Sequence, residues 1–206
     1  MLGLAASLLL AAAAPAELAG DYVLHQPETA SGLRLQKDGR FQWYLSQGAL
    51  DLAAEGGWTR AGDTLILTTP STVPPSFSLI SATRTTQPEL VVRVENPAGA
   101  GIQGIDILLR YAAGEAEVGH TDGEGGCRFE LKQGGKPQYV ALAIGMFEFR
   151  SPDFAVDSAR ANVLTFRLQP NDLGKQSFAG EPVRIVEEGL ELVWRGQRLV
   201  YRRAGQ

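Results

Sequence analysis

From residue 17 onward, apolar and polar side chains alternate in short runs that are separated by turns. Such alternation places one row of side chains on each face of a strand, which is typical of strands buried on one side. Glycine is frequent, with 24 residues, and it falls between the apolar runs, where turns need it. No long segment follows the 3.6-residue period of an amphipathic helix. The pattern therefore predicts an all-β protein.

The clearest local signal is a hairpin with its turn at 37–40. Leu33 and Leu35 alternate before this turn, which contains the Asp-Gly pair that tolerates positive φ. Phe41 and Trp43 follow the turn at alternate positions and therefore share one face. The spacing predicts two antiparallel strands with a common apolar side.

Changes in the pattern of apolar runs and turns along the chain predict two domains. Three prolines between 70 and 75 exclude a central strand there. We expect a first β domain made of 17–84 and 178–206, a lipocalin-like barrel or meander, with a small β-sandwich of 88–170 inserted between its halves. Terminal strands that close a barrel remove its open edges, which is a physical reason for the C-terminal segment to rejoin the first domain. The alternative is two β domains in series. The expected strands of the sandwich are 90–94, 105–109, 127–131, 139–144, 146–149 and 163–168.

Residues 1–16 have the character of a secretory signal peptide. Leu2–Ala14 is an unbroken run of small and apolar residues, and Ala14 and Ala16 supply the small side chains of a cleavage site. The run is too short to span a bilayer, so we expect no stable membrane span in the mature chain. The predicted location is periplasmic or secreted. The alternative is a buried or interfacial N-terminal helix.

Part of the first domain resembles the small lipocalin-like domains of bacterial exported proteins. Those domains share an opening G-x-Y/W, an L-x-L…D-G-x-F hairpin, a G-x-W strand and a G-x-x-L-x-L strand. The matching segments are 18–22, 33–41, 56–58 and 62–67. The resemblance implies a small β-barrel.

Part of the second domain is similar to the carboxypeptidase-regulatory-like, or transthyretin-like, β-sandwich. The segments that carry the likeness are 92–99, 102–109 and 121–129. Ile102 stands where that family often has proline, and Cys127 where it usually has phenylalanine. The resemblance implies a structural or interaction module, and the family motif carries no catalytic residue.

Charge and cysteine content narrow the classes of function. The net charge of −4 argues against a nucleic-acid partner, which would require a basic stripe. The four arginines near the C-terminus are interpreted as charge that guards a strand edge. They are Arg195, Arg198, Arg202 and Arg203. The single cysteine, Cys127, excludes an intramolecular disulfide and shares a row with Phe129, so we expect it in the core.

No constellation of residues predicts a catalytic or metal site. Two histidines, His25 and His120, with one cysteine are too few for zinc. His120 is expected to be exposed, and no Gly-x-Ser-x-Gly elbow accompanies His25. The carboxylates of Asp122 and Glu124 are too few for a calcium loop. We expect no cofactor. A hydrolase that uses carboxylates remains an alternative, and its candidates are Glu115, Glu117, Glu187 and Glu188.

Four aromatic residues of the first domain have two interpretations. Tyr22, Phe41, Trp43 and Trp58 are expected either to fill a small barrel or to line an apolar cavity. The core interpretation is favoured. The predicted function is therefore an exported, non-enzymatic binding or protein-interaction module, with an unknown protein as its partner. A carrier of a small apolar ligand is the alternative.

Overall fold

The computed structural model describes residues 17–112, 114, 116–131 and 136–205. The regular structure of these residues consists of seventeen strands and one short 3₁₀ turn, which confirms the all-β prediction. The chain divides into two compact units, one formed by Met1–Thr72 with Gly174–Gln206 and the other by Val73–Leu173. The predicted signal peptide at 1–16 lies outside the described residues. No helix in the described part of the chain is long and apolar enough to cross a membrane.

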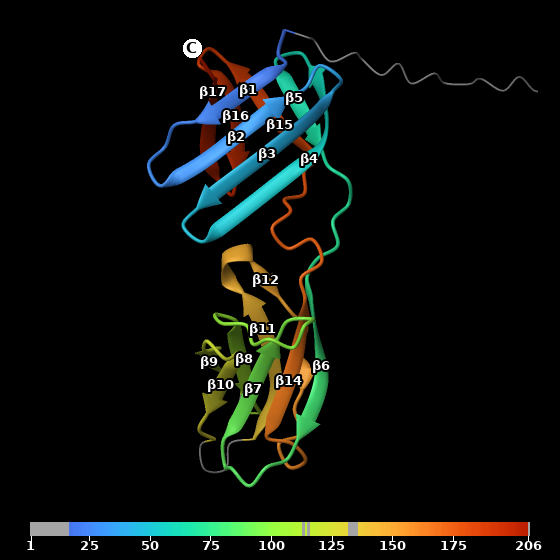
Figure 1. Cartoon of the computed structure of the whole chain (residues 1–206), viewed down its shortest axis with the longest axis vertical. Coiled ribbons are helices and arrows are strands. Elements are labelled where there is room, and N and C mark those ends of the chain that lie inside the picture. Colours follow the sequence, from blue (N-terminus) through green and yellow to red (C-terminus); the bar gives the residue numbers. More distant parts are fainter. Residues whose placement is uncertain (1–16, 113, 115, 132–135, 206) are drawn as a thin grey trace, which may run out of the picture. The chain divides into compact units, whose positions relative to one another are not determined.

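The first unit is a closed antiparallel barrel of eight strands (Figure 1). Five strands come from the N-terminal half and three from the C-terminal end of the chain. They are β1 (Gly20–Leu24), β2 (Thr29–Leu35), β3 (Arg40–Gln47), β4 (Leu50–Ala61), β5 (Thr64–Thr68), β15 (Ala179–Val186), β16 (Gly189–Trp194) and β17 (Gln197–Arg203). The order around the barrel is β1-β17-β16-β15-β5-β4-β3-β2.

The barrel closes because the last strand pairs on both sides. β17 pairs with β16 and also with β1, with Tyr22 opposite Arg203. The interpretation of the C-terminal arginines as guards of a strand edge is therefore wrong, since β17 has no free edge. Arg195 instead stacks on the ring of Trp194, and Arg203 stacks on the ring of Tyr22.

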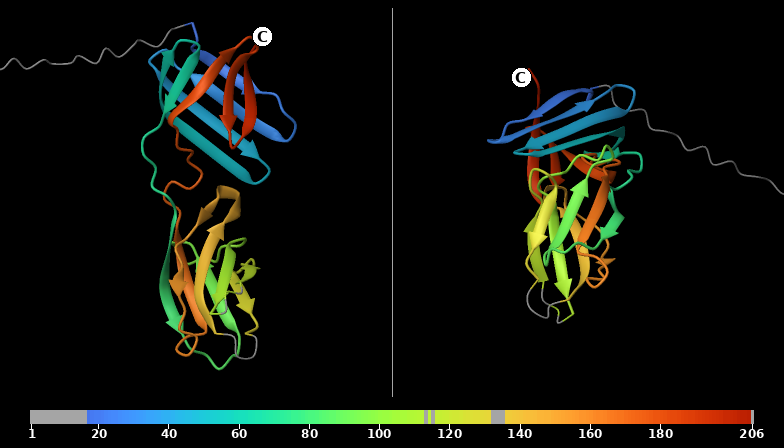
Figure 2. Two further views of the ribbon diagram at one scale, coloured as in Figure 1. Left: turned by 180° about the vertical axis from the view of Figure 1, so that it is seen from behind. Right: turned by 60° about the horizontal axis from the view of Figure 1, so that its bottom comes forward.

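The second unit is a small β-sandwich of two sheets (Figure 2). One sheet has the order β10-β7-β14-β6, and the other has the order β12-β11-β8-β9, with β13 paired to β11. The strands are β6 (Ser76–Thr83), β7 (Leu90–Glu95), β8 (Asp106–Tyr111), β9 (Ala116–His120), β10 (Gly126–Phe129), β11 (Pro137–Ile144), β12 (Phe149–Arg150), β13 (Phe154–Ala155) and β14 (Val163–Gln169).

The structure differs from the expected strands at three places. Residues 76–83, which the predicted boundaries assign to the first domain, form β6 and pair with β14 of the sandwich. Of the expected strand at 146–149, the first two residues belong to the 3₁₀ turn η1 (Gly145–Phe147) and only Phe149 is in a strand, because the chain turns at Glu148 with φ of 54°. β9 was not expected, since its residues alternate between half-buried and exposed without an apolar row.

The sandwich core is aliphatic and aromatic, and it contains the single thiol. Cys127 is 7% exposed and belongs to the same buried cluster as Phe129 and Phe166, which confirms its predicted place in the core. Burial raises the pKa of the Cys127 thiol, because the thiolate would lose its hydration. The neutral thiol therefore acts as a small apolar side chain.

Candidate functional site

The four predicted aromatic residues all point into the barrel. Tyr22, Phe41, Trp43 and Trp58 are 4%, 1%, 2% and 2% exposed. The ring of Trp43 lies 5.3 Å from that of Phe178 and 6.2 Å from that of Trp194, centroid to centroid. These distances are those of packed aromatic pairs. The structure thus brings the predicted residues into a common interior that side chains fill.

A chain of hydrogen bonds connects the polar atoms inside the barrel. The indole N–H of Trp43 donates to the hydroxyl oxygen of Tyr201 over 2.8 Å. An indole nitrogen only donates, so the proton of Tyr201 goes to Ser31 Oγ, 2.9 Å away. The Ser31 hydroxyl in turn donates to the backbone carbonyl of Tyr44. Burial raises the pKa of Tyr201, because its phenolate would be desolvated.

The other aromatic polar atoms also have protein partners. The indole N–H of Trp58 donates to the carbonyl of Gln36, and the hydroxyl of Tyr22 donates to that of Leu18. No buried side-chain nitrogen or oxygen of the described residues lacks a hydrogen-bond partner. Polar groups that wait for a ligand would be left unsatisfied in its absence. The interior therefore has the character of a core rather than of a site.

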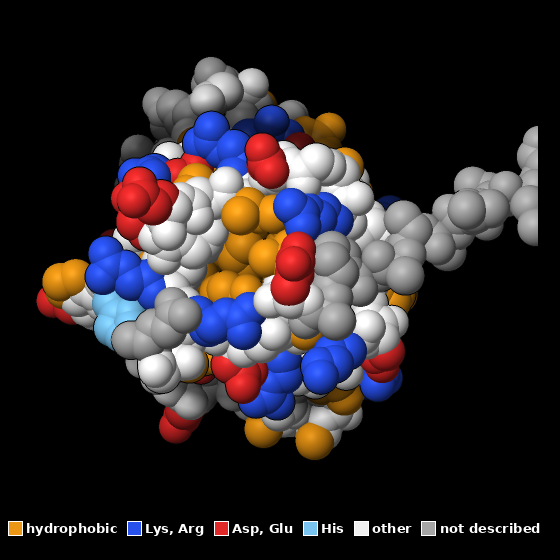
Figure 3. All heavy atoms as spheres, turned by 90° about the horizontal axis from the view of Figure 1, so that it is seen from above, with side chains coloured by type: hydrophobic (Ala, Val, Ile, Leu, Met, Phe, Trp, Pro, Cys, Tyr) orange, Lys and Arg blue, Asp and Glu red, His pale blue; other side chains and the backbone are white. Residues whose placement is uncertain are grey.

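Apolar and charged side chains are arranged regularly at the end of the barrel where β1 begins and β17 ends. Apolar side chains occupy its centre, and Lys, Arg, Asp and Glu side chains surround them (Figure 3). Arg60 and Arg203 lie at this end, and both donate hydrogen bonds to Glu17. These bonds hold the beginning of the described chain against the barrel.

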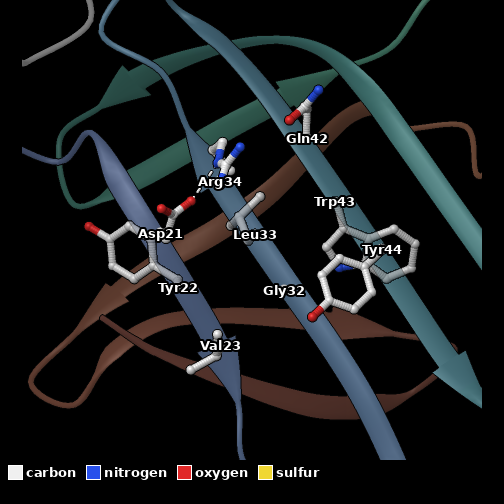
Figure 4. Close-up of a pocket in the computed structure, with 9 residues that line it drawn as sticks. All are labelled: Asp21, Tyr22, Val23, Gly32, Leu33, Arg34, Gln42, Trp43 and Tyr44. Carbon is white, nitrogen blue, oxygen red and sulfur yellow. Dashed lines mark hydrogen bonds and ion pairs between the residues drawn. The ribbon is translucent and has the colours of Figure 1, made fainter. Parts of the chain in front are cut away.

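A pocket of about 390 Å³ lies on the outer face of β1, β2 and β3 (Figure 4). Most of its lining side chains come from the outward row of each strand, which the inward aromatic row leaves free to face solvent. They are Asp21 and Val23 of β1, Arg34 of β2, and Gln42 and Tyr44 of β3, with Gly32 at the floor. The inward residues Tyr22, Leu33 and Trp43 also contribute to the lining.

Gly32 and Tyr44 form the centre of this pocket. The two residues are directly opposite in the β2–β3 pairing. A Cβ at Gly32 would lie 2.6 Å from a ring carbon of Tyr44, so the ring covers the glycine and would have to shift to accommodate a larger residue. Aromatic rings over glycines also stabilise sheets. Because Tyr44 is 50% exposed, much of its ring remains open to solvent.

Polar groups lie beside this ring. Arg34 Nε donates to Asp21 Oδ1 over 2.5 Å, and both side chains are more than half exposed. The hydrogen bond to Asp21 raises the pKa of Arg34, so the guanidinium stays charged. The amide of Gln42 supplies both a donor and an acceptor. The pocket can therefore hold a small polar molecule that has one flat apolar face.

A second pocket, of about 370 Å³, lies where β1 meets β17. Val23, His25 and Arg202 contribute to its lining. His25 is exposed. His120 of the sandwich is also exposed, as predicted, and its Nδ1 lies 2.7 Å from Asp106 Oδ1. No group of three or more potential metal ligands occurs among the residues that the structure describes.

The carboxylates considered for hydrolysis lie in separate places. Glu117 accepts a hydrogen bond from the hydroxyl of Tyr111 in the sandwich. Glu187 and Glu188 are exposed in the turn between β15 and β16 of the barrel. Glu115 lies outside the described residues. The structure does not gather these four into one described site.

Sequence reasoning missed one buried carboxylate, Glu191. Its side chain is 1% exposed although it points outward, because Arg184 and Arg198 cover it with ion pairs. The hydrogen bonds from Arg198 and Arg184 lower the pKa of Glu191. A turn at 187–188 places residue 184 opposite residue 191, so the hairpin register predicts the ion pair between Arg184 and Glu191. It does not predict the pair with Arg198. The same rule, applied to a turn at 37–40, would pair Gly32 with Leu45. The turn instead begins at Gln36, which lies opposite Arg40, and this shift of one residue pairs Gly32 with Tyr44.

Comparison with known families and curated proteins suggests no function for this chain. No family model matches the chain, and no curated protein matches it.

Proposed function

We propose that this protein is an exported, non-enzymatic binding module that holds its ligand on the outside of a lipocalin-like barrel. The signal-peptide character of residues 1–16 supports export. The transthyretin-like sandwich would then serve as an interaction domain attached to the barrel. The observation that carries the proposal is the exposed ring of Tyr44 above Gly32.

The contrast between the two faces of β3 supports an outer site. On the inner face, Phe41 and Trp43 are buried and the indole N–H is bonded within the protein. On the outer face, Gln42 and Tyr44 are exposed and line a pocket. A ligand therefore finds free surface on the outer face, whereas a ligand in the barrel interior would have to displace core side chains.

The pocket chemistry favours a neutral sugar ring as the ligand. The C–H face of a sugar can pack on the exposed tyrosine ring, as apolar groups pack on aromatic faces. Its hydroxyl groups can donate to Asp21 and accept from Arg34 or Gln42. A few polar groups around one apolar contact are the usual composition of a small-molecule site.

The test is a nitrogen-15 NMR titration of the protein with neutral hexasaccharides of glucose and of N-acetylglucosamine. We expect shifts of backbone amides in β1, β2 and β3, with the indole signals of Trp43 and Trp58 unchanged. Tyr44→Ser should abolish these shifts. Tyr139→Ser, which removes another exposed tyrosine from the sandwich, is the matched control and should preserve them.

Two results would contradict this function. Binding of no sugar by the unmodified protein would remove the ligand class. Indole shifts of Trp43 and Trp58 on addition of a long-chain fatty acid would show an interior ligand, and they would favour the carrier alternative.

A further inference from the structure

β6 ends its sheet without a second neighbour. Among the described strands it pairs only with β14 in that sheet. The edge is plain in the views of the sandwich (Figures 1 and 2). Six consecutive residues, 78–83, are exposed, and Leu79 and Ile80 are 41% and 43% exposed. An edge strand of this kind presents free backbone groups to another strand.

The sequence of β6 lacks the charges that usually prevent such pairing. Ser76–Thr83 contains no Asp, Glu, Lys or Arg, and no proline. In a symmetric dimer the same strand of both copies meets at the axis, so any charge near the axis would face the same charge of the other copy. An uncharged strand is therefore suited to pairing with itself.

We propose that β6 pairs antiparallel with β6 of a second copy of this chain, about a two-fold axis between Leu79 and Ile80. The two four-stranded sheets would then become one continuous sheet. The partner is a second copy because the strand is complementary to itself in this register. Ser78 lies opposite Ser81, Phe77 opposite Ala82, and Ser76 opposite Thr83 of the other copy. Each pair joins two hydroxyls or a large and a small side chain.

A β-bulge makes this register possible. Thr165 pairs with Ser81 and Phe166 with Leu79, so Ile80 is an extra residue in β6. The bulge puts Ser78 and Ser81 on the same face, although three positions separate them. Residues opposite one another in an antiparallel pair share a face, and in a regular strand this offset would break that rule.

The same bulge keeps the core faces of the two copies on one side. Phe77 is opposite Leu168, and Ala82 is opposite Leu164, and both partners on β14 are core residues. Phe77 and Ala82 therefore share the core face and meet across the axis. Bulges commonly discourage edge pairing. Here the axis passes through the bulge, so the bulges of the two copies lie opposite each other, with Ile80 of each copy facing Leu79 of the other.

The first test is sedimentation of the unmodified protein over a range of concentrations. We expect a reversible monomer–dimer equilibrium. Ile80→Lys should raise the dimer dissociation constant by about tenfold or more, because two like charges meet near the axis. Val193→Lys is the matched control, since Val193 is 51% exposed on the barrel exterior, and it should leave the equilibrium unchanged.

The second test fixes the register by disulfide formation in a Cys127→Ala background. A mixture of Ser78→Cys and Ser81→Cys proteins should cross-link, because opposed Cβ atoms lie about 5 Å apart. Either variant alone should cross-link slowly, since like positions would be offset by about 10 Å. Both serines are exposed on β6, so the fold should tolerate these changes.

Three results would overturn the proposal. A protein that stays monomeric at the highest concentration has no self-pairing edge. A dimer that is equally strong in Ile80→Lys uses another surface. Cross-linking that is as fast in the single variants as in the mixture excludes the register.

Discussion

The barrel and the sandwich treat their strand edges in opposite ways. Every barrel strand has two neighbours, because β17 returns to pair with β1. In the sandwich, β6 has one neighbour in its sheet and carries no charge. Arg184 and Arg198 of the barrel lie on strands that have no free edge, and they cover Glu191. Arg203 of β17 stacks on an aromatic ring. Charge on a strand is thus poor evidence of an edge.

The interiors of the two units also differ in chemistry. The barrel interior contains all three tryptophans of the chain, Trp43, Trp58 and Trp194. It also contains a chain of hydrogen-bonded hydroxyls. The hydrophobic cluster of the sandwich consists of aliphatic residues, phenylalanines and one thiol, and its buried polar side chains, Thr121, Ser151 and Asn162, bond mainly to backbone atoms. Tryptophan fluorescence therefore reports on the barrel alone, and the two units can be compared within one molecule.

The largest expected effect separates the stabilities of the two units. Trp43→Ala should destabilise the barrel by about 3–5 kcal/mol, because it leaves a cavity and removes the donor to Tyr201. Urea unfolding followed by fluorescence of Trp58 and Trp194 measures this change. Circular dichroism, which records strands of both units, should then show the sandwich transition at its original midpoint.

Phe166→Ala is the matched variant in the sandwich. Phe166 is fully buried in the sandwich, so its loss should lower the sandwich stability by a similar amount. The fluorescence transition should stay in place. A fluorescence midpoint that moves with Phe166→Ala would mean that the two units unfold together.

A smaller effect tests how tightly the barrel is closed. A Cβ at Gly56 would lie 2.1 Å from the backbone oxygen of Thr68 on β5, so Gly56→Ala must push two strands apart. We expect a loss of about 1–3 kcal/mol in the fluorescence-detected transition. At the next residue, Gly57, the nearest atom would be 3.8 Å away, so Gly57→Ala should change stability by less than about 0.5 kcal/mol. Equal effects of the two changes would show that the strands do not approach so closely.

Much of the barrel could be predicted because its pairings are local. The turn near 37–40 places β2 beside β3, and alternation then assigns Trp43 to the inside and Tyr44 to the outside. The pairing of Tyr44 with Gly32 needs a register shifted by one residue from that of a turn at 37–40, because Gln36 lies opposite Arg40. The four inward aromatics were the predicted ligand-binding residues, and two of them, Tyr22 and Trp43, contribute to the pocket lining. Tyr44, on the outward row, was not predicted.

The sandwich was less predictable because its key pairing spans most of the unit. β6 pairs with β14, which begins 80 residues after β6 ends, and no local turn specifies that partner. The run at Met146–Phe149 resembled a strand by composition, but the positive φ at Glu148 turns the chain there. Tertiary context outweighs local preference in such short segments.

The buried hydroxyl chain gives the barrel a dependence on alkaline pH. Tyr201 has a raised pKa in the folded protein, so above its ordinary value of 10.0 the unfolded chain loses a proton that the folded barrel keeps. Stability should therefore fall as the pH rises from about 10 through the folded pKa. Tyr201→Phe should cost about 1–3 kcal/mol at neutral pH, because the Trp43 indole loses its acceptor. The variant should also show a shallower alkaline decline, and an identical decline would contradict the assignment.

The smallest expected effect is a change of pKa with salt, and it is compared between one carboxylate of each unit. Hydrogen bonds from Arg198 and Arg184 lower the pKa of Glu191 in the barrel, whereas backbone amides of Gly126 and Glu124 lower the pKa of Asp122 in the sandwich. In both cases stability is present above the ordinary pKa of the carboxyl group and is lost as the pH falls through the folded value. Salt weakens attraction between charged groups more than it weakens hydrogen bonds from a fixed backbone. Raising the salt from about 0.05 M to about 0.5 M should therefore move the pKa of Glu191 toward its ordinary value and move that of Asp122 less. Carbon-detected NMR titration of the two carboxyl groups measures both in one sample. A larger shift at Asp122 would mean that its arginine neighbours, rather than the turn, hold its charge.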